Sequence, residues 1–352
     1  MPRRLLITGA GGAATSNLIR SLHAADPSLA IIGCHHDRFA LKRSSAQRNY
    51  LTPLSASPDF PDTLLRIIDK EQIDLVIPNN DLDVKIIAAL RDTVPCRLFL
   101  PRKHVIELCQ DKYDLTVYLR SRQLPAPLTF SVTDLERLEA VFEELAPHRE
   151  LWCRIRTGSN ARGALRVNHP DQARSWIKYW EMMRGVSPTS FTLSEYLPGR
   201  DFLCHTLWKD GIPVLMKTFE RLAYLGGASN PTSVSALART VVDERLAAIC
   251  VQVVSAVDSN ASGAFSIDLK EDAAGNPLVT EINAGRFLMA MNAFDVTGSH
   301  NMAITYVRLG LDEAVDIRNM YDTVEEYYVV RDFDMPPEVF RAEEFFEGIE
   351  EL

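Results

Sequence analysis

The sequence predicts an α/β protein whose N-terminal part is a parallel sheet of the Rossmann type. Short apolar runs of strand length alternate with helical patterns, and a glycine-rich turn, Gly9-Ala-Gly-Gly, follows the first run directly. The alternation consists of a strand at 4–8, a helix carrying Leu18, Ile19 and Leu22, a strand at 30–34, a helix at 62–69 and a strand at 75–78. Strands and helices in this order form parallel sheets with right-handed crossovers. We therefore expect residues 1–108 to form one Rossmann-like domain.

The composition indicates a folded protein whose main partner is not nucleic acid. The chain has 352 residues, of which 46% are hydrophobic, so it can bury a core in more than one domain. Its net charge of −9 lacks the basic excess of a surface that binds a phosphate backbone. No apolar run reaches the roughly 20 residues that span a bilayer, and the first run stops at Gly9, too short for a signal peptide. We expect a cytoplasmic protein without a membrane partner.

The cysteines agree with a reducing compartment. All six are widely spaced, and none belongs to a C-x-x-C pair of the kind that binds zinc or cycles between thiol and disulfide. We expect reduced, mostly buried thiols rather than a disulfide framework.

The pattern changes at residue 109, where a second and larger domain is predicted. A helix at Asp111–Arg122 is closed by Leu124-Pro-Ala-Pro, because proline cannot continue a helix. Further helices are expected at 134–145, 171–184 and 242–257, and strands at 152–167 (two), 190–196, 202–208, 213–218, 264–269 and 277–283. This mixture favours an α+β arrangement after the parallel sheet.

The predicted domains are 1–108, then 109–330 with an α+β lid at about 128–190, and an acidic tail at 331–352. From Glu338 onward the tail places Phe340, Phe345 and Phe346 among acidic residues. An amphipathic helix that caps the body is expected there.

The strongest chemical signal is a predicted β-hairpin with three oxygen-bearing side chains. Turn-forming residues at 272–276 separate two strand-like runs, which should therefore pair as antiparallel strands. Glu281 and Asn283 stand two residues apart and share one face, and Asp268 lies across the hairpin from them. Carboxylate and amide oxygens suit Mg²⁺. A solvated hairpin with a polar outer face is the alternative for this segment alone.

The hairpin resembles the metal-binding hairpin of the ATP-grasp superfamily, which includes D-alanine–D-alanine ligase, biotin carboxylase and the large subunit of carbamoyl phosphate synthetase. The resemblance implies that Asp268, Glu281 and Asn283 hold Mg²⁺, or Mn²⁺, against the phosphates of ATP. Relatives often continue Asn-x-Arg, with an arginine that contacts substrate or phosphate. Here Arg286 stands one residue later, after the additional Gly285.

Two earlier segments resemble nucleotide-binding parts of the same superfamily, in the expected order. The helix that begins near Lys112 and ends before Leu124 resembles the entry segment whose lysine touches the nucleotide phosphates. The stretch from Arg154 to Gly163 resembles the glycine-bearing phosphate loop of the lid, with Arg154 where lysine is usual. Arg156 shares its strand face, so either arginine is a candidate for the phosphate contact.

A third segment resembles the hinge strand of the superfamily. The resemblance implies that Glu195, Tyr196 and Leu197 surround the adenine and that Asp201 binds the ribose hydroxyls. An ordinary strand followed by a turn is the alternative.

Two further resemblances complete the chain. Arg221 and the loop 226–229 stand where relatives often handle substrate. The residues from 5 to 22 resemble the N-terminal domain that precedes the ATP-grasp fold in carbamoyl-phosphate-synthetase-like proteins. The chain is thus expected to join a Rossmann-like pre-ATP-grasp domain to an ATP-grasp fold.

The N-terminal turn also allows a different class of protein. Gly9-x-Gly11-x-x-Ala14 after a strand, with Asp37 after the second strand, matches a dinucleotide fingerprint. An NAD-dependent oxidoreductase is therefore the alternative, although 109–300 contains no Tyr-x-x-x-Lys or comparable hydride-transfer set. A nucleotide-binding regulator without catalysis is a third possibility.

The resemblance implies a ligase that uses ATP to activate a small carboxylate as an acyl phosphate and then couples it to an amine. Arg154, Asn283 and Arg286 are the expected catalytic residues. A carboxylase or carbamoyl-phosphate-synthetase-like enzyme that uses bicarbonate stays open, and a homodimer is the expected assembly.

Overall fold

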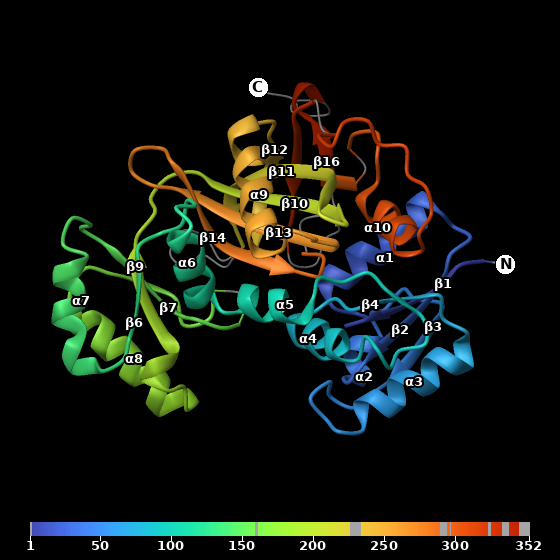
Figure 1. The fold of residues 1–352 in the computed structure, drawn as a ribbon, viewed down its shortest axis with the longest axis horizontal. Coiled ribbons are helices and arrows are strands. Elements are labelled where there is room, and N and C mark those ends of the chain that lie inside the picture. Colours follow the sequence, from blue (N-terminus) through green and yellow to red (C-terminus); the bar gives the residue numbers. More distant parts are fainter. Residues whose placement is uncertain are drawn as a thin grey trace, which may run out of the picture.

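The N-terminal part of the chain forms a five-stranded parallel sheet, as the sequence predicts (Figure 1). The computed structural model describes residues 2–158, 161–225, 234–288, 294–295, 297–322, 325–332 and 338–344. The strand order is β3-β2-β1-β4-β5. The strands are β1 (Arg4–Thr8), β2 (Ala30–His35), β3 (Arg48–Leu51), β4 (Leu75–Ile77) and β5 (Arg97–Leu98), and the helices are α1 (Ala13–Ala25), α2 (Arg38–Leu41), α3 (Phe60–Glu71), α4 (Asp81–Ala89) and α5 (Lys103–Gln110).

The apolar pattern of the sequence does not predict β3 and β5, the two short strands at the edges of this sheet. β3 is an edge strand with mostly exposed side chains, and β5 has two residues, so neither produces a buried run. α4 begins after Asn80, whose side chain accepts a hydrogen bond from the Asp83 N–H and caps the helix. This cap places a polar loop at the carboxyl end of β4, next to the site described below.

The second sheet has seven strands in the order β14-β13-β10-β11-β12-β15-β16. Its named strands pair antiparallel with their neighbours. They are β10 (Asp201–Lys209), β11 (Ile212–Tyr224), β12 (Ser235–Thr240), β13 (Gly263–Glu271), β14 (Pro277–Ala284), β15 (Tyr327–Val330) and β16 (Glu338–Arg341), and the helices beside the sheet are α6 (Lys112–Ser121), α9 (Glu244–Val257) and α10 (Met302–Gly310).

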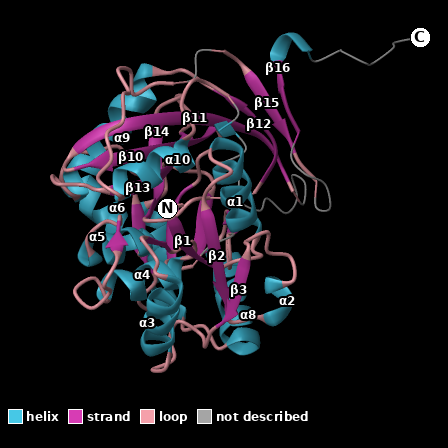
Figure 2. Ribbon diagram, turned by 90° about the vertical axis from the view of Figure 1, so that its right-hand side faces the viewer, coloured by secondary structure: helices cyan, strands magenta, loops and turns pink. Residues whose placement is uncertain are grey.

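The prediction of a helix from Glu338 onward is wrong for the part of the tail that the structure describes. Glu338–Arg341 is strand β16, which pairs with β15 at the edge of the large sheet, and a short 3-10 turn follows at Ala342–Glu344 (Figure 2). Backbone pairing with an available edge outweighs the helical period of a short acidic segment. Phe345 and Phe346 lie outside the described residues.

The predicted lid is a third, four-stranded sheet with two helices on it, at the left of Figure 1. Its strand order is β6-β9-β7-β8, and each pair is antiparallel. The strands are β6 (Thr129–Ser131), β7 (Leu151–Ile155), β8 (Leu165–Val167) and β9 (Phe191–Glu195), and the helices are α7 (Leu138–Glu144), preceded by a 3-10 turn, and α8 (Pro170–Arg184).

Three hydrophobic clusters hold these parts together. Two of them combine side chains of the parallel sheet with side chains of the large sheet, so that Leu5 and Ile7 share a cluster with Phe219, Phe287 and Tyr306. The third consists of residues between Leu128 and Leu193 and belongs to the lid. The lid therefore packs around its own core, whereas the two larger sheets share theirs.

Among the described residues, no helix has the length and apolar character needed to cross a membrane.

Candidate active site

The hairpin β13–β14 brings the three predicted metal ligands together. Asp268 pairs with Glu281 and Ser266 with Asn283, so the side chains of Asp268, Glu281 and Asn283 lie on one face. The Asn283 Nδ2 donates to Asp268 Oδ2 at 3.1 Å. The convergence that strand alternation predicts is confirmed in the geometry, while the role of these residues as ligands stays a prediction.

A bulge in the same hairpin creates an acceptor for the lid. The register shifts between Asp268 and Leu269, and Thr280 is left without a residue opposite it. The Thr280 carbonyl oxygen accepts a hydrogen bond of 3.0 Å from Arg154 Nη2. The irregularity in β14 therefore allows a cation from strand β7 to reach the hairpin.

Two cations lie beside the carboxylates. Lys112 Nζ is 3.6 Å from Glu281 Oε2 and donates to the Gly158 carbonyl at 2.6 Å. The buried Arg154 Nε has no hydrogen-bond partner among the described residues. Burial lowers the pKa of Arg154, against the attraction of Glu281 and Asp268. A buried guanidinium N–H without an acceptor fits an anionic ligand such as a phosphate.

The neighbouring arginine has a different environment. Arg156 Nε lies 2.8 Å from Asp111 Oδ2, and Arg156 Nη2 lies 2.8 Å from Asp114 Oδ1, at the start of α6. Arg154 thus donates to a backbone carbonyl of the hairpin, whereas Arg156 pairs with two carboxylates at the start of α6. Of the two, Arg154 lies at the hairpin, and the nucleotide contact predicted for Arg156 stays a prediction.

Arg221 bridges a predicted metal ligand and the predicted ribose acid. Its Nη2 donates to Asp268 Oδ1 at 2.5 Å and its Nη1 to Asp201 Oδ1 at 2.7 Å, with Arg221 8% exposed. Tyr224 also donates to Asp201. Burial raises the pKa of Asp268 to about 6 in spite of Arg221. Sequence reasoning assigned Arg221 to substrate, together with the loop 226–229, which lies outside the described residues.

The hinge residues lie at the end of β9. Glu195 Oε1 accepts from the Leu128 N–H at 2.8 Å, so its side chain fixes the chain that enters β6. The Tyr196 N–H donates to the Glu150 carbonyl at 3.1 Å, and Leu197 is buried. The adenine contacts of Glu195, Tyr196 and Leu197 and the ribose contact of Asp201 stay predictions.

Arg286 turns back towards the hairpin because Gly285 has a positive φ of 90°. A Cβ at Gly285 would lie 2.8 Å from Val84 Cγ1. With this turn, Arg286 Nη2 donates to Asn283 Oδ1 at 2.6 Å, and its Nε donates to Asp81, the first residue of α4. The additional glycine therefore keeps Arg286 beside the predicted metal ligand.

Asp81 is a site residue that sequence reasoning missed. It belongs to the polar run Asn79-Asn80-Asp81, which follows the buried strand β4 after Pro78. The Phe287 N–H donates to Asn79 Oδ1 at 2.8 Å, so the same run holds both residues that follow Gly285. Polar residues at the carboxyl end of a parallel strand are the signal that identifies such a position.

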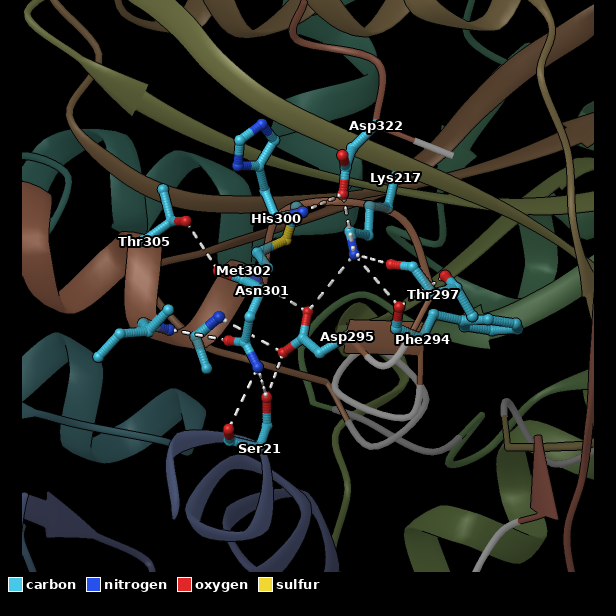
Figure 3. A network of polar contacts seen from close by, with 12 residues as sticks. Ser21, Lys217, Phe294, Asp295, Thr297, His300, Asn301, Met302, Thr305 and Asp322 are labelled. Carbon is cyan, nitrogen blue, oxygen red and sulfur yellow. Dashed lines mark hydrogen bonds and ion pairs between the residues drawn. The ribbon is translucent and has the colours of Figure 1, made fainter. Parts of the chain in front are cut away.

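The segment after Arg286 is anchored by a buried lysine (Figure 3). Lys217 on β11 is 1% exposed, and its Nζ donates to the carbonyls of Thr297 at 2.9 Å and Phe294 at 3.2 Å. Asp322 lies 3.4 Å and Asp295 3.9 Å from the same nitrogen. Sequence reasoning missed this network because its members are far apart in the chain.

The dinucleotide interpretation of the N-terminal turn finds no support. A Cβ at Gly11 would lie 1.7 Å from the Ala40 carbonyl oxygen, so α2 packs directly on the turn. Asp37 caps α2 by accepting a hydrogen bond of 2.8 Å from the Phe39 N–H. The glycine and the acid of the fingerprint thus have structural roles.

The oxygen donors at the hairpin suit a metal ion whose remaining coordination positions are filled by a bound phosphate compound and water. Across the described ranges, no group of three His, Cys, Asp or Glu side chains is placed to hold a metal ion by itself. The hairpin offers two carboxylates and one amide, and Mg²⁺ usually completes such a set with water and phosphate oxygens.

No protein-family model matches this chain, and no curated protein sequence matches it. Several solved structures are similar in fold at low sequence identity. The biotin carboxylase domain of Hydrogenobacter thermophilus 2-oxoglutarate carboxylase, in complex with MgADP, ADP and bicarbonate, has a TM-score of 0.72 and 12% identity over 94% of this chain and 74% of its own.

Two further solved structures that are similar in fold are of differently named enzymes. Carboxyaminoimidazole ribonucleotide synthase from Aspergillus clavatus, in complex with ATP, has a TM-score of 0.70 and 15% identity over 94% of this chain and 81% of its own. L-amino acid ligase from Bacillus licheniformis has a TM-score of 0.71 and 15% identity over 93% and 79%. This chain therefore has the ATP-grasp fold, preceded by a Rossmann-like parallel sheet, as the sequence predicts.

Proposed function

We propose that this protein is an ATP-dependent, ADP-forming ligase that activates a small carboxylate as an acyl phosphate and couples it to an amine. The observation that carries the proposal is the meeting of Arg154, Lys112, Glu281 and Asp268 at one hairpin, with a buried Arg154 N–H that lacks an acceptor among the residues the structure describes. Cations and carboxylates side by side suit a polyphosphate bound with a divalent metal.

The similar structures support this assignment at the level of chemistry. One is described with MgADP and bicarbonate, one with ATP, and one is named as an L-amino acid ligase. Bicarbonate belongs to the same class of oxygen nucleophiles as a carboxylate. It is therefore included in the test below.

The residues divide the work as follows. Lys112 and Arg154 bind the phosphates, with Arg156 as a second candidate, and Asp268, Glu281 and Asn283 hold Mg²⁺ or Mn²⁺. The metal supplies positive charge that neutralises the phosphate oxygens. Adenine lies against Glu195, Tyr196 and Leu197, and the ribose hydroxyls bind Asp201.

Arg286 acts at the acyl end of the site. A carboxylate oxygen attacks the γ-phosphorus, and the bond to ADP breaks with its electron pair on ADP. The amine nitrogen then attacks the acyl carbon, phosphate departs with the C–O electron pair, and the nitrogen loses a proton. Asp81 and Asn283 hold the guanidinium of Arg286 beside the acyl group, where it stabilises the oxyanion.

The arrangement of domains and partners follows from the same proposal. We place the domains at 1–108 and 109–330, with the lid at about 128–190 and the tail at 331–352. A homodimer is proposed as the assembly.

ADP release measures the proposed activity directly. Purified protein with MgATP is tested against a panel of amino acids, hydroxy acids and bicarbonate, each with and without a primary amine. Glu281→Gln should lower ADP release by roughly a hundredfold or more, because one metal-binding carboxylate becomes neutral at unchanged shape. Lys178→Met on the lid surface is the matched control. Equal turnover of Glu281→Gln and the unaltered chain would contradict the proposal.

A further inference from the structure

A small polar cavity lies at the carboxyl end of the parallel sheet, separate from the hairpin. Its volume is about 10 Å³, which is room for one water-sized species. It is lined by the ends of β1 and β2, the chain after β3, and the starts of α3 and α4. The polar residues of the lining are Thr8, His35, His36, Thr52, Ser55, Asn80 and Asp83.

Asp83 gives this cavity its chemical character. It is 7% exposed, and its carboxylate accepts hydrogen bonds from Ser55 Oγ and, at 2.6 Å, from Asn80 Nδ2. Both donors are neutral. Among the ion pairs of the described residues, none includes Asp83. A buried carboxylate is costly without a counter-charge, although the N-terminus of α4 offsets part of that cost.

The adjacent histidine does not provide the missing charge. His35 Nδ1 accepts a hydrogen bond of 2.8 Å from the Asp37 N–H, and its ring stacks on His36 at 4.4 Å. Burial, together with His36, lowers the pKa of His35, so the ring is neutral at neutral pH. The lining therefore combines one buried carboxylate with several hydroxyl and amide groups and the imidazoles of His35 and His36.

The position of the cavity connects it to the proposed chemistry. In the order β3-β2-β1-β4-β5 the strands are added on one side of β1 up to β3 and then on its other side from β4. This point between β1 and β4 is the topological switch point, and ligands of such parallel sheets bind at the carboxyl ends of the strands beside it. Thr8 ends β1 and Asn80 follows β4, and both line the cavity. The next residue after Asn80 is Asp81, which holds Arg286. Consecutive Cα atoms are about 3.8 Å apart.

We propose that this cavity binds the ammonium group of the amine substrate, with Asp83 as its counter-charge. The inference rests on the proposed ligase function for the fate of the amine, but not for its binding. Ammonium is the size of water, carries one positive charge and donates four hydrogen bonds, which matches a water-sized cavity with a buried carboxylate. Asn80, which lines the cavity, directly precedes Asp81, the carboxylate that holds Arg286.

Two sources have this chemistry, namely free ammonia and the head group of a primary amine. The thermal midpoint of the protein is measured in ammonium, methylammonium, tetramethylammonium and sodium chlorides at equal ionic strength, without nucleotide. Stabilisation by ammonium but not by sodium or tetramethylammonium is expected. If methylammonium stabilises the protein as much as ammonium does, the natural ligand is the head group of a primary amine. If methylammonium does not stabilise it, the natural ligand is free ammonia.

Two variants assign the effect to the cavity. Asp83→Asn keeps the shape but removes the charge, and should weaken apparent ammonium binding at least tenfold. Asp62→Asn is the matched control, because Asp62 is an exposed carboxylate in the first turn of α3, as Asp83 is in α4. Ser55→Ala, which leaves the carboxylate in place, should weaken binding by a smaller factor.

A crystal soaked in rubidium chloride gives an independent readout, because Rb⁺ is close to ammonium in size and scatters anomalously. A peak in the cavity beside Asp83, absent in Asp83→Asn, supports the site. The proposal is overturned if ammonium stabilises no more than sodium, if Asp83→Asn responds like the unaltered chain, or if no peak appears. None of these experiments measures turnover. They therefore test ammonium binding at the cavity even if the proposed ligase activity is wrong.

Discussion

Arg221 Nη2 lies 2.5 Å from Asp268 Oδ1, and its Nη1 lies 2.7 Å from Asp201, so one guanidinium neutralises two acids of the site. Asp201 begins β10 and Asp268 lies on β13, which pairs with β10, and both side chains face the same side of the sheet as Arg221 on β11. The arginine thereby occupies one oxygen of Asp268 that a metal ion would also use.

Arg221→Met should lower the free energy of unfolding by about 3 kcal/mol, because it leaves Asp201 and Asp268 without their counter-charge. Mg²⁺ should restore more stability to this variant than to the unaltered chain, since the ion replaces the lost charge. Urea denaturation with and without Mg²⁺ measures both effects. Arg318→Met removes an arginine that is 91% exposed and should change the free energy of unfolding little. Equal effects of the two substitutions would contradict the assigned role of Arg221.

Lys112→Met should raise the dissociation constant of ATP at least tenfold, since it removes the ammonium that lies between Glu281 and the Gly158 carbonyl. The methylene stem is retained, so helix α6 should keep its packing. Isothermal titration calorimetry with a non-hydrolysable ATP analogue measures the change. Lys178→Met serves as the control, and unchanged affinity in Lys112→Met would place the phosphates elsewhere.

His205→Gln should make the protein less sensitive to acid. Burial, reinforced by Lys217, lowers the pKa of His205 to about 3. The unfolded chain binds a proton near the ordinary histidine pKa of about 6.5, whereas the folded chain does not bind it until about 3. Stability that is present above the higher value is therefore lost as the pH falls through this window.

The cost attributable to His205 at about pH 5 is about 2 kcal/mol, from 1.36 kcal/mol per pKa unit. Urea denaturation at about pH 7.5 and about pH 5 should show a smaller loss in His205→Gln than in the unaltered chain by that amount. Identical losses would mean that His205 is protonated without penalty in the fold.

The cysteines should react slowly with a thiol reagent at about pH 8 while the chain is folded. Five of them are buried, and burial, with a smaller effect of Asp74, raises the pKa of Cys96 to about 11. As the pH rises towards that value, Cys96 should react first, and Cys96→Ser should remove that reaction. All six should react at once after unfolding in guanidinium. A fast thiol in the folded protein at about pH 8 would contradict this environment.

The local pattern of side chains in the sequence was sufficient to predict the strands of the site. It was not sufficient to predict contacts between segments that are distant in the chain. Strand alternation places Glu281 and Asn283 on one face, and the structure has them there, opposite Asp268 and Ser266. The choice between Arg154 and Arg156 required the bulge at Thr280, which sequence alone does not reveal. Asp81 and Lys217 were missed because their partners lie more than seventy residues away in the chain.

The errors in secondary structure have a common physical origin. Glu338–Arg341 is too short for its helical period to decide its conformation, and an unpaired strand edge offered backbone hydrogen bonds instead. β3 was missed for the opposite reason, since its exposed side chains follow no buried pattern although its backbone pairs with β2.

The separate core of the lid has a mechanical consequence. Arg154 belongs to the lid, whereas Lys112 and Glu281 belong to the body, and in this structure the hydrogen bond from Arg154 to Thr280 is one of the links between them. A nucleotide bound as proposed, by Arg154 and Lys112 directly and by Glu281 through a metal ion, would cross-link two bodies that otherwise fold around different interiors. Its arrival should slow amide exchange in the lid more than in either of the larger sheets.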